Sequence, residues 1–458
     1  MAFLEQIHQM VWGPWTLLAF LGIGVFYSIK SRLFQIRGFS YWWRETVGSL
    51  GKSSKRLENE KNEKKGISQF QSVCTALAAT VGTGNIAGVA TALTAGGPGA
   101  LFWMWISALI GMISAYAETV LGLRYRYTDE EGHYMCGPFV YMERGLGIKW
   151  MGVAYGLLCL MSSLGMGSMV QSNSAVGTMA YSWKVPAMAG GIVLTLLIML
   201  VICGGIGRIG SVAEMLVPAA SGIYIVFSLV VIFSCYDRLP ATFAAIFRSA
   251  FSPSAAVGGA AGYGISRSLR YGMARGVFSN EAGLGTLAIL HGAAEDPAPE
   301  KQGMWAMFEV FFDTIVLCTL TALVILCMTD SMPENIPYEG AALASWCFRG
   351  RIGMAGEYLV SGSMVVFAFA TMIAWFYLGR QAASYVAGAL SVGEKGRKRF
   401  VNRIYPALYL AAVFAGSVGR LEVVWTLSDI WNGLMAFPNL TALLFLSSQV
   451  IVPNWKKR

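Results

Sequence analysis

The chain has 458 residues, of which 55% are hydrophobic and 13% are charged, and its mean hydropathy is +0.56. Soluble proteins carry about 25% charged residues, so this composition excludes a soluble globular protein and predicts an all-α polytopic membrane protein. The formal net charge of +9 comes from lysines and arginines in the predicted loops, which indicates membrane orientation rather than nucleic-acid binding.

Apolar runs long enough to cross a bilayer recur along the whole chain, and we count about eleven of them. The runs are 11–29, 69–95, 99–123, 150–180, 186–206, 211–234, 264–291, 303–328, 356–387, 404–418 and 424–452. The first has no lysine or arginine before it, so we expect no cleaved signal peptide.

Basic residues predict the orientation of these runs in the cell membrane. The loop 30–65 carries ten lysines and arginines and is therefore expected to be cytoplasmic. Basic clusters in 124–149, 395–403 and 456–458 fall on the same side. We therefore expect the N-terminus outside and the C-terminus in the cytoplasm.

The run 69–95 is interrupted near its centre, where three glycines and three polar side chains lie between Thr80 and Gly88. Gly costs about 1 kcal/mol per residue in a helix interior. A helix broken at membrane depth exposes backbone groups, which is tolerated where they line a cavity or bind a ligand. We therefore expect a broken, solute-binding helix. The alternative is a close-packed face of small residues, because Gly84 and Gly88 have GxxxG spacing.

The run 264–291 contains three arginines and the pair Asn280-Glu281, so we expect a second break near 278–283. The alternative is an amphipathic or re-entrant element at the inner surface. The two interrupted spans lie five spans apart and therefore cross the membrane in opposite directions. Two inverted five-span units, each led by a broken helix, form a LeuT-type 5+5 repeat.

This repeat predicts three parts of the chain. Residues 1–68 hold an extra N-terminal transmembrane helix and a cytoplasmic basic loop. Residues 69–234 form the first five-helix repeat, and residues 235–458 form the second, with an outer cap segment near 329–355.

Four segments resemble the alanine/glycine:cation symporter family (sodium:alanine symporters) of the amino acid–polyamine–organocation superfamily. They are residues 81–88, 96–105, 274–285 and 313–314, and the resemblance extends over nearly the whole chain. It implies a LeuT-type fold and uptake of alanine or glycine driven by Na⁺, with H⁺ as the alternative coupling ion.

The expected substrate site holds a zwitterionic amino acid between the two breaks. Its residues are Thr83, Gly84, Asn85, Gln171, Phe278, Ser279 and Asn280. Free N–H groups at the start of the outer half-helix suit a carboxylate, and backbone carbonyls near Asn280 suit an ammonium group. Phe278 would limit the space for the substrate side chain. Gln171 is implied by the family resemblance, and its alternative role is a hydrogen bond between helices.

The expected sodium site lies at the end of the inner half-helix, where free carbonyl oxygens suit a hard cation. Its residues are Ala78, Thr80, Val81 and Thr371. The part of Thr371 is implied by resemblance to the superfamily, and its alternative is a hydrogen bond to its own helix.

Three carboxylates stand out inside predicted spans: Glu118, Glu309 and Asp313. An ionised group at mid-bilayer costs at least about 2.5–3.5 kcal/mol, so each needs a partner or a wet cavity. We expect Glu118 to brace the broken helices and Asp313 to take part in ion coupling or proton transfer. Arg270 and Arg275 are candidate partners for Glu309 and Asp313.

The patterns alone predict a secondary transporter of a small solute, and the family resemblance implies a secondary active symporter and not an enzyme. An enzyme would need an activated nucleophile or a metal cluster, and the three histidines and eight cysteines have no paired short spacings. A channel would favour rings of charge around a pore, and a sensor would add an output domain. We expect a monomer whose partners are a small neutral amino acid and the lipid bilayer, with Na⁺ as the only metal and no cofactor.

Overall fold

The computed structural model describes residues 2–50, 66–129, 132–251, 267–295, 298–331, 336–391, 393–419 and 422–455. Within these residues the chain is helical except for loops and one small hairpin, which confirms the all-α prediction. In the hairpin, β1 (Tyr127–Thr128) pairs antiparallel with β2 (Tyr134–Met135), and Tyr127 lies opposite Met135.

The helices of the first half are α1 (Ala2–Val11), α2 (Pro14–Lys30), α3 (Phe34–Arg37), α4 (Phe39–Glu45), η1 (Val47–Ser49), α6 (Gln69–Thr80), η2 (Thr83–Asn85), α7 (Ala87–Gly96), α8 (Gly99–Tyr125), α9 (Pro138–Arg144), α10 (Lys149–Leu164), η3 (Gly165–Val170), α11 (Gln171–Trp183), α12 (Ala187–Ile202) and α13 (Gly205–Ser234). Here η3 is a π-helical turn that joins α10 to α11.

The helices of the second half are η4 (Tyr236–Arg238), α14 (Leu239–Ala250), α15 (Arg267–Asn280), α16 (Thr286–His291), α17 (Pro299–Val310), η6 (Phe311–Cys318), α18 (Thr319–Met328), α19 (Gly340–Ile352), α20 (Met354–Ala389), α21 (Glu394–Arg399), η8 (Phe400–Ile404), α22 (Tyr405–Val418), α23 (Glu422–Phe445) and η9 (Ser447–Gln449). The π-helical turn η6 joins α17 to α18.

Six helical segments of the described chain are long and apolar enough to cross a membrane. They are Gln6–Lys30, Gly99–Tyr125, Lys149–Trp183, Gly205–Ser234, Pro299–Met328 and Met354–Ala389. A seventh span consists of α6 and α7, which are bent by 54° at the expected break. The remaining predicted spans contain α12, α15 with α16, α22 and α23, which do not meet the same criteria. The count of eleven, the 5+5 repeat and the three-part division therefore stay predictions.

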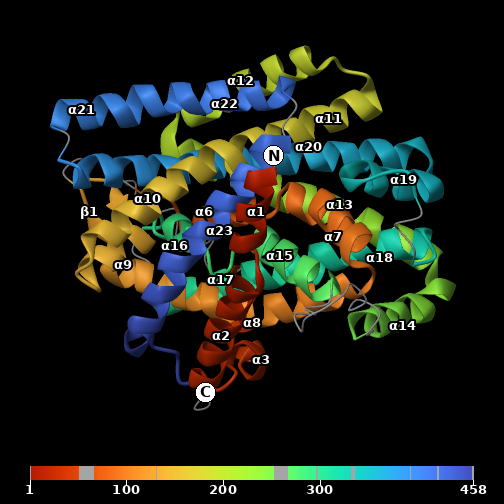
Figure 1. The fold of residues 1–458 in the computed structure, drawn as a ribbon, viewed down its shortest axis with the longest axis horizontal. Helices are drawn as coiled ribbons and strands as arrows, with labels where there is room; N and C mark the ends of the chain where they lie inside the picture. The colour runs from red at the N-terminus through yellow and green to blue at the C-terminus, as the bar shows by residue number, and fades with distance from the viewer. Residues whose placement is uncertain are drawn as a thin grey trace.

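Two long helices, α8 and α20, run across the molecule in the same general direction (Figure 1). α8 packs against α15, α16 and α17, whereas α20 packs against α6, α10, α11 and α19. The two interrupted elements lie between these groups, because α7 packs on α15 and α6 packs on α16. This packing brings both helix breaks into the core.

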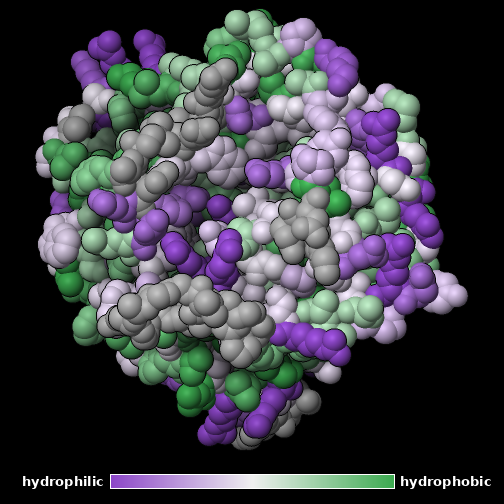
Figure 2. Space-filling model, turned by 45° about the vertical axis from the view of Figure 1, so that its right-hand side comes forward, coloured by the Kyte–Doolittle hydropathy of each residue, from purple (hydrophilic) through white to green (hydrophobic). Residues whose placement is uncertain are grey.

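The outer faces of α12 and α13 carry large apolar side chains that the fold leaves exposed. They include Val193, Leu196 and Leu200 on α12, and Val226 and Phe233 on α13. Large exposed apolar surfaces are typical of contact with a bilayer. Figure 2 is turned to bring the side of α14 and α19 forward, and it shows hydrophilic side chains around a hollow in this face.

The N-terminal segment that contains α1 and α2 is hydrogen-bonded to α23. The indole of Trp12 donates to the carbonyl of Asp429 at 2.9 Å, and the hydroxyl of Tyr27 donates to the carbonyl of Leu443 at 2.7 Å. Phe20 on α2 packs so closely on the second break that a Cβ at Gly283 would lie 2.4 Å from its ring.

Candidate functional site at the two helix breaks

The first break opens the backbone of α6 at its end. The amide of Val81 still donates to the carbonyl of Leu77 at 2.7 Å. The amide of Gly82 turns away and donates to Asn85 Oδ1 at 2.9 Å, so it does not close the helix onto the carbonyl of Ala78. The helix end therefore presents carbonyl oxygens, including that of Ala78, to the break.

The glycines of the first break allow close contact with two other helices. A Cβ on Gly82 would lie 2.6 Å from Thr371 Oγ1 on α20, and a Cβ on Gly84 would lie 3.3 Å from the Cα of Ser279 on α15. Neither glycine has a positive φ. The glycines are therefore needed for space rather than for an unusual backbone conformation.

Asp313, in the π-helical turn η6, connects the two breaks. Its Oδ1 accepts a hydrogen bond from Asn85 Nδ2 at 2.6 Å, and its Oδ2 accepts hydrogen bonds from Ser279 Oγ at 2.8 Å and Thr314 Oγ1 at 3.0 Å. Asn280 Nδ2 donates to Thr314 Oγ1 at 3.1 Å. All five residues are buried, so four neutral polar side chains surround one carboxylate in the core.

Several groups at the first break have no protein partner or a weak one. Among the described residues, the buried hydroxyl of Thr83 has no hydrogen-bond partner. The amide of Thr83 donates to Gln171 Oε1 at 3.3 Å. Thr371 Oγ1 lies 3.4 Å from the carbonyl oxygen of Val81 and donates to Phe367 of its own helix at 3.0 Å.

Unlike the Thr371 hydroxyl, which also lies near the Val81 carbonyl of another helix, the Thr80 hydroxyl contacts only its own helix. Its hydroxyl lies 3.3 Å from the carbonyl of Leu77 and 3.5 Å from that of Ala76, both within α6. Its side chain therefore bonds to its own turn, as hydroxyls inside helices often do.

The second break has a different backbone. Glu281, Gly283 and Gly285 have φ values of 56°, 91° and 85°, so the chain passes through the left-handed region three times within five residues. The Glu281 carboxylate accepts hydrogen bonds from Thr286 Oγ1 at 2.5 Å and from Trp375 Nε1 at 3.0 Å.

Glu118, on α8, lies against the second break. The amide nitrogen of Asn439 donates to Glu118 Oε1 at 2.6 Å and to the carbonyl of Gly283 at 2.9 Å. The backbone N–H groups of Gly283 and Gly285 also lie beside this carboxylate. Glu118 thus links α8 and α23 to the second break.

Arg275 pairs with neither Glu309 nor Asp313. Glu309 Oε2 lies 3.1 Å from His291 Nε2, and both side chains are fully buried. Arg275 Nη1 lies instead 3.7 Å from Asp429 Oδ2, and its guanidinium lies 5.3 Å from the ring centroid of Phe278. The partner of Glu309 is therefore a histidine, and the partners of Asp313 are uncharged hydrogen-bond donors, where we expected an arginine in both cases.

Two cavities lie on either side of the breaks. One has a volume of about 350 Å³ beneath α19 and includes Met364 of α20 in its wall, and the other has about 120 Å³ beside the β1–β2 hairpin and includes Tyr377. Thr371 lies between these two positions on α20. Since Thr83 and Ser279 are also buried, the breaks are closed to both cavities.

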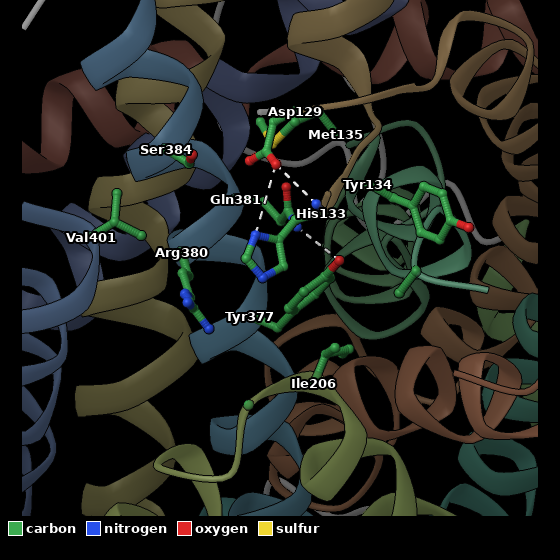
Figure 3. Close-up of a pocket in the computed structure, with 12 residues that line it drawn as sticks. Asp129, His133, Tyr134, Met135, Ile206, Tyr377, Arg380, Gln381, Ser384 and Val401 are labelled. Carbon is green, nitrogen blue, oxygen red and sulfur yellow. Dashed lines mark hydrogen bonds and ion pairs between the residues drawn. The ribbon is translucent and has the colours of Figure 1, made fainter. Parts of the chain in front are cut away.

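The cavity beside the hairpin combines charges of both signs. Figure 3 shows His133 with Asp129 beside it and Arg380 on the neighbouring α20. His133 Nδ1 lies 3.8 Å from Asp129 Oδ1, and Arg380 donates to Asn402 at 2.9 Å.

Sequence reasoning missed Trp375, Asp429 and Asn439. Trp375 follows Thr371 by four residues, so helical periodicity puts both on one face of α20 and was the signal available. Asp429 and Asn439 are polar residues within the apolar run 424–452. The cost of placing a charge inside the bilayer, which drew attention to Glu118, Glu309 and Asp313, could have drawn attention to Asp429 as well.

Comparisons with known proteins show which family the chain resembles. A family model described as the sodium:alanine symporter family matches residues 1–455. The chain is 37% identical over 453 residues to the sodium/alanine symporter AgcS of Methanococcus maripaludis, covering 98% of this chain and 95% of AgcS. It is 32% identical over 443 residues to the probable sodium/glutamine symporter GlnT of Bacillus subtilis, covering 97% of this chain and 87% of GlnT.

A solved structure supports the fold. The crystal structure of MhsT in complex with L-phenylalanine matches 85% of this chain and all of the MhsT chain, with a TM-score of 0.54 and 13% sequence identity. At that identity the likeness shows a shared LeuT-type fold alone.

Proposed function

Because this chain belongs to the sodium:alanine symporter family, we propose that it takes up a small neutral amino acid, alanine or glycine, together with Na⁺ by alternating access. Family membership makes it a membrane-embedded amino-acid symporter and not an enzyme. The proposal adds the substrate, the ion, the binding residues, a monomeric state and an outside N-terminus.

The observation that carries the proposal is the open backbone of the first break. The hydroxyl of Thr83 is buried and has no protein partner among the described residues, and the amide of Thr83 reaches only Gln171 Oε1, at 3.3 Å. An unsatisfied buried polar group costs about 1–3 kcal/mol. A ligand that supplies a carboxylate to these donors and a cation to the nearby carbonyls would remove that cost.

In this proposal Na⁺ binds at the end of α6. Its ligands are the carbonyl oxygens of Ala78 and Val81 and the hydroxyl of Thr371, with Thr80 in the adjacent turn. The 3.4 Å between Thr371 Oγ1 and the Val81 oxygen brings two oxygens to one point, which suits a hard cation.

The amino acid binds between the two breaks. Its carboxylate accepts from the amides near Gly84 and from the Gln171 side chain, and carbonyls near Ser279 and Asn280 accept from its ammonium group. Phe278 closes over a small side chain.

Asp313 couples the two breaks in this proposal. It holds Asn85 of the first and Ser279 of the second, so a change of its charge or partners alters both at once. If H⁺ replaces Na⁺ as the coupling ion, Asp313 is its carrier.

The energetics suit accumulation of a neutral zwitterion. One Na⁺ that enters the cell down a membrane potential of about −100 mV, inside negative, releases about 2.3 kcal/mol. A tenfold Na⁺ gradient adds about 1.4 kcal/mol, and each 1.4 kcal/mol is a factor of ten. One ion therefore sustains accumulation of roughly 500-fold.

Uptake of radiolabelled alanine into proteoliposomes tests the proposal, with Na⁺, Li⁺ and H⁺ gradients imposed separately. We expect saturable uptake that requires the Na⁺ gradient and is reduced by unlabelled glycine. Uptake driven by H⁺ alone would refute sodium coupling. Stronger competition by glutamine than by glycine would indicate instead that the substrate is an amino acid with a larger, amide-bearing side chain.

A further inference from the structure

A third cavity, of about 190 Å³, lies between α1, α15 and α23. We call it the α1 cavity. α1 contributes His8 to its wall, α15 contributes Arg270, Arg275 and Phe278, and α23 contributes Asp429. On the predicted orientation this cavity faces the outside.

The α1 cavity carries more positive than negative charge. Asp429 Oδ2 lies 3.3 Å from His8 Nε2 and 3.7 Å from Arg275 Nη1. The second distance exceeds a normal hydrogen bond, so the arginine is held loosely. Arg270 makes no hydrogen bond or ion pair with any residue in the described part of the chain. The cavity wall therefore holds two guanidinium groups but one carboxylate, and only Arg275 lies near that carboxylate.

The charged groups are partly withdrawn from water. The Arg275 and Asp429 side chains are 20% and 10% exposed. Electrostatic interactions at such sites are stronger than on an open surface. The guanidinium fork also matches a carboxylate by two parallel hydrogen bonds.

We propose that the α1 cavity is a separate outer binding site for a free amino acid. Arg270 and Arg275 hold its α-carboxylate, and Asp429 holds its α-ammonium group. A simple anion would satisfy the arginines but not Asp429, so the charge pattern selects a zwitterion. This inference rests on the proposed function, since it adds a subsite to the same transport pathway.

Binding of an amino acid in the α1 cavity would weaken the contact between Arg275 and Asp429, which lies above the breaks. The α-carboxylate competes with Asp429 for Arg275, and Arg275 also covers the ring of Phe278. Phe278 lines the α1 cavity and directly precedes Ser279, which bonds to Asp313. Binding therefore weakens the tie between α15 and α23 and frees the ring that separates the cavity from the central site.

Arg270→Gln tests the site in the kinetics of sodium-driven alanine uptake. The matched control is Arg267→Gln, because Arg267 lies three residues earlier on α15 and is exposed outside the cavity. We expect Arg270→Gln to raise KM for alanine ~10-fold with kcat and the half-saturating Na⁺ concentration unchanged, as for loss of a charge-assisted contact. Arg267→Gln should match the parent, and Arg270→Lys should fall between.

Labelling provides a readout that does not depend on transport. Ala274 lines the cavity, so Ala274→Cys is made in a Cys203→Ser background, since Cys203 is the exposed cysteine of the described chain. We expect a sulfonate-bearing methanethiosulfonate reagent to react ~10-fold faster than a trimethylammonium one. Alanine should slow both reactions, whereas propionate and ethylamine should protect less.

Adding Gly84→Leu to this labelling variant separates the cavity from the central site. Protection by alanine should persist, because Gly84 lies at the break and not in the cavity wall. Loss of protection would overturn the separate site. An unchanged KM for Arg270→Gln in a protein that takes up alanine normally would overturn the inference alone. A parent protein that takes up no alanine would overturn the proposed function, and the inference with it.

Discussion

The two helix breaks interrupt the backbone by different means. The first, at Gly82 and Gly84, needs space and contains no positive φ. The second passes through the left-handed region at Glu281, Gly283 and Gly285. Among the described residues that form these two breaks, only the first leaves a buried side-chain hydroxyl, that of Thr83, without a partner.

The polar groups of the second break are satisfied by the protein itself. Glu281 is bonded by Thr286 and Trp375, and the carbonyl of Leu284 accepts from the hydroxyl of Tyr155 at 2.7 Å. We infer that the first break exchanges ligands whereas the second maintains the shape of the site. Substitutions at the first should therefore change binding, and substitutions at the second should change stability.

The largest expected effect is that of Gly84→Leu. A Cβ there already lies 3.3 Å from Ser279, so the longer side chain must fill the space of the ligand. Overpacking costs about 1–3 kcal/mol, and with the lost ligand contacts we expect alanine binding to fall at least ~100-fold. Binding is measured on purified protein by scintillation proximity.

Gly88→Leu is the matched control for this prediction. The nearest atom to a Cβ at Gly88 is 4.0 Å away, so the same side chain should be tolerated. Equal losses in both variants would favour a close-packed face of small residues over a binding break.

Next in size is the loss of stability in Glu281→Leu. It leaves the N–H of Trp375 and the hydroxyl of Thr286 buried without their acceptor, at about 1–3 kcal/mol each. We expect a lower unfolding temperature in detergent and an unchanged half-saturating Na⁺ concentration for the folded fraction. Glu281→Gln keeps an acceptor and should be affected less. A stable Glu281→Leu that has lost sodium dependence would reverse the roles of the two breaks.

Thr371→Val should affect the ion at the first break. It keeps the shape but removes one oxygen, so we expect the Na⁺ concentration for half-maximal uptake to rise ~10-fold, as for one lost charge-assisted contact. Alanine binding should weaken in low Na⁺ and recover in excess Na⁺, because coupled ligands affect each other reciprocally. The measurement is alanine binding across a Na⁺ titration.

Thr371→Ser, which keeps the hydroxyl, is the control for this prediction. If Thr371→Val retains its sodium dependence while Asp313→Asn loses it, the ion site lies around Asp313. Proton coupling would then be the better explanation.

A smaller effect is expected for Phe278→Ala, beside the second break. The removed ring should admit larger substrates such as valine and weaken alanine ~3- to 10-fold, since deleting contacts in an apolar pocket costs about 1–3 kcal/mol. Competition by a series of amino acids against labelled alanine measures this. An unaltered competition profile would mean that the ring does not line the pocket.

The smallest effect on function is expected for single cysteine substitutions, which test whether the two broken helices cross the membrane in opposite directions. Cysteines at Ser54 and Glu334, both outside the described residues, should be labelled only from the cytoplasm and only from outside, respectively. Cys203→Ser removes the exposed thiol of the described chain and provides the background. Labelling of both from one side would contradict the inverted repeat.

Local patterns in the sequence were sufficient to predict six of the spans and the first break. Glycines and polar residues inside the run 69–95 are costly in a continuous helix, and the structure bends there by 54°. The second break was expected near 278–283 for the same reason, and the left-handed residues Glu281 and Gly283 lie within that stretch.

The contacts between distant segments could not be predicted in this way. Asn85 and Asp313 are 228 residues apart, and their contact depends on how the π-helical turn η6 packs against the first break. The pairing of His291 with Glu309 likewise depends on how α16 docks on α17. Hydropathy and charge counts contain no information on this packing.

The ties between the N-terminal helices and α23 have a consequence for the order of synthesis. Trp12 and Asp429 are separated by 417 residues, and Tyr27 and Leu443 by 416. The ribosome therefore finishes almost the whole chain before α1 and α2 meet these partners. Such long-range contacts slow folding, and unpaired surfaces invite misassembly in the meantime. A chain stalled before α23 would hold inserted helices and yet lack the wall formed by Asp429, so a nascent protein acquires its α1 cavity in the last step of assembly.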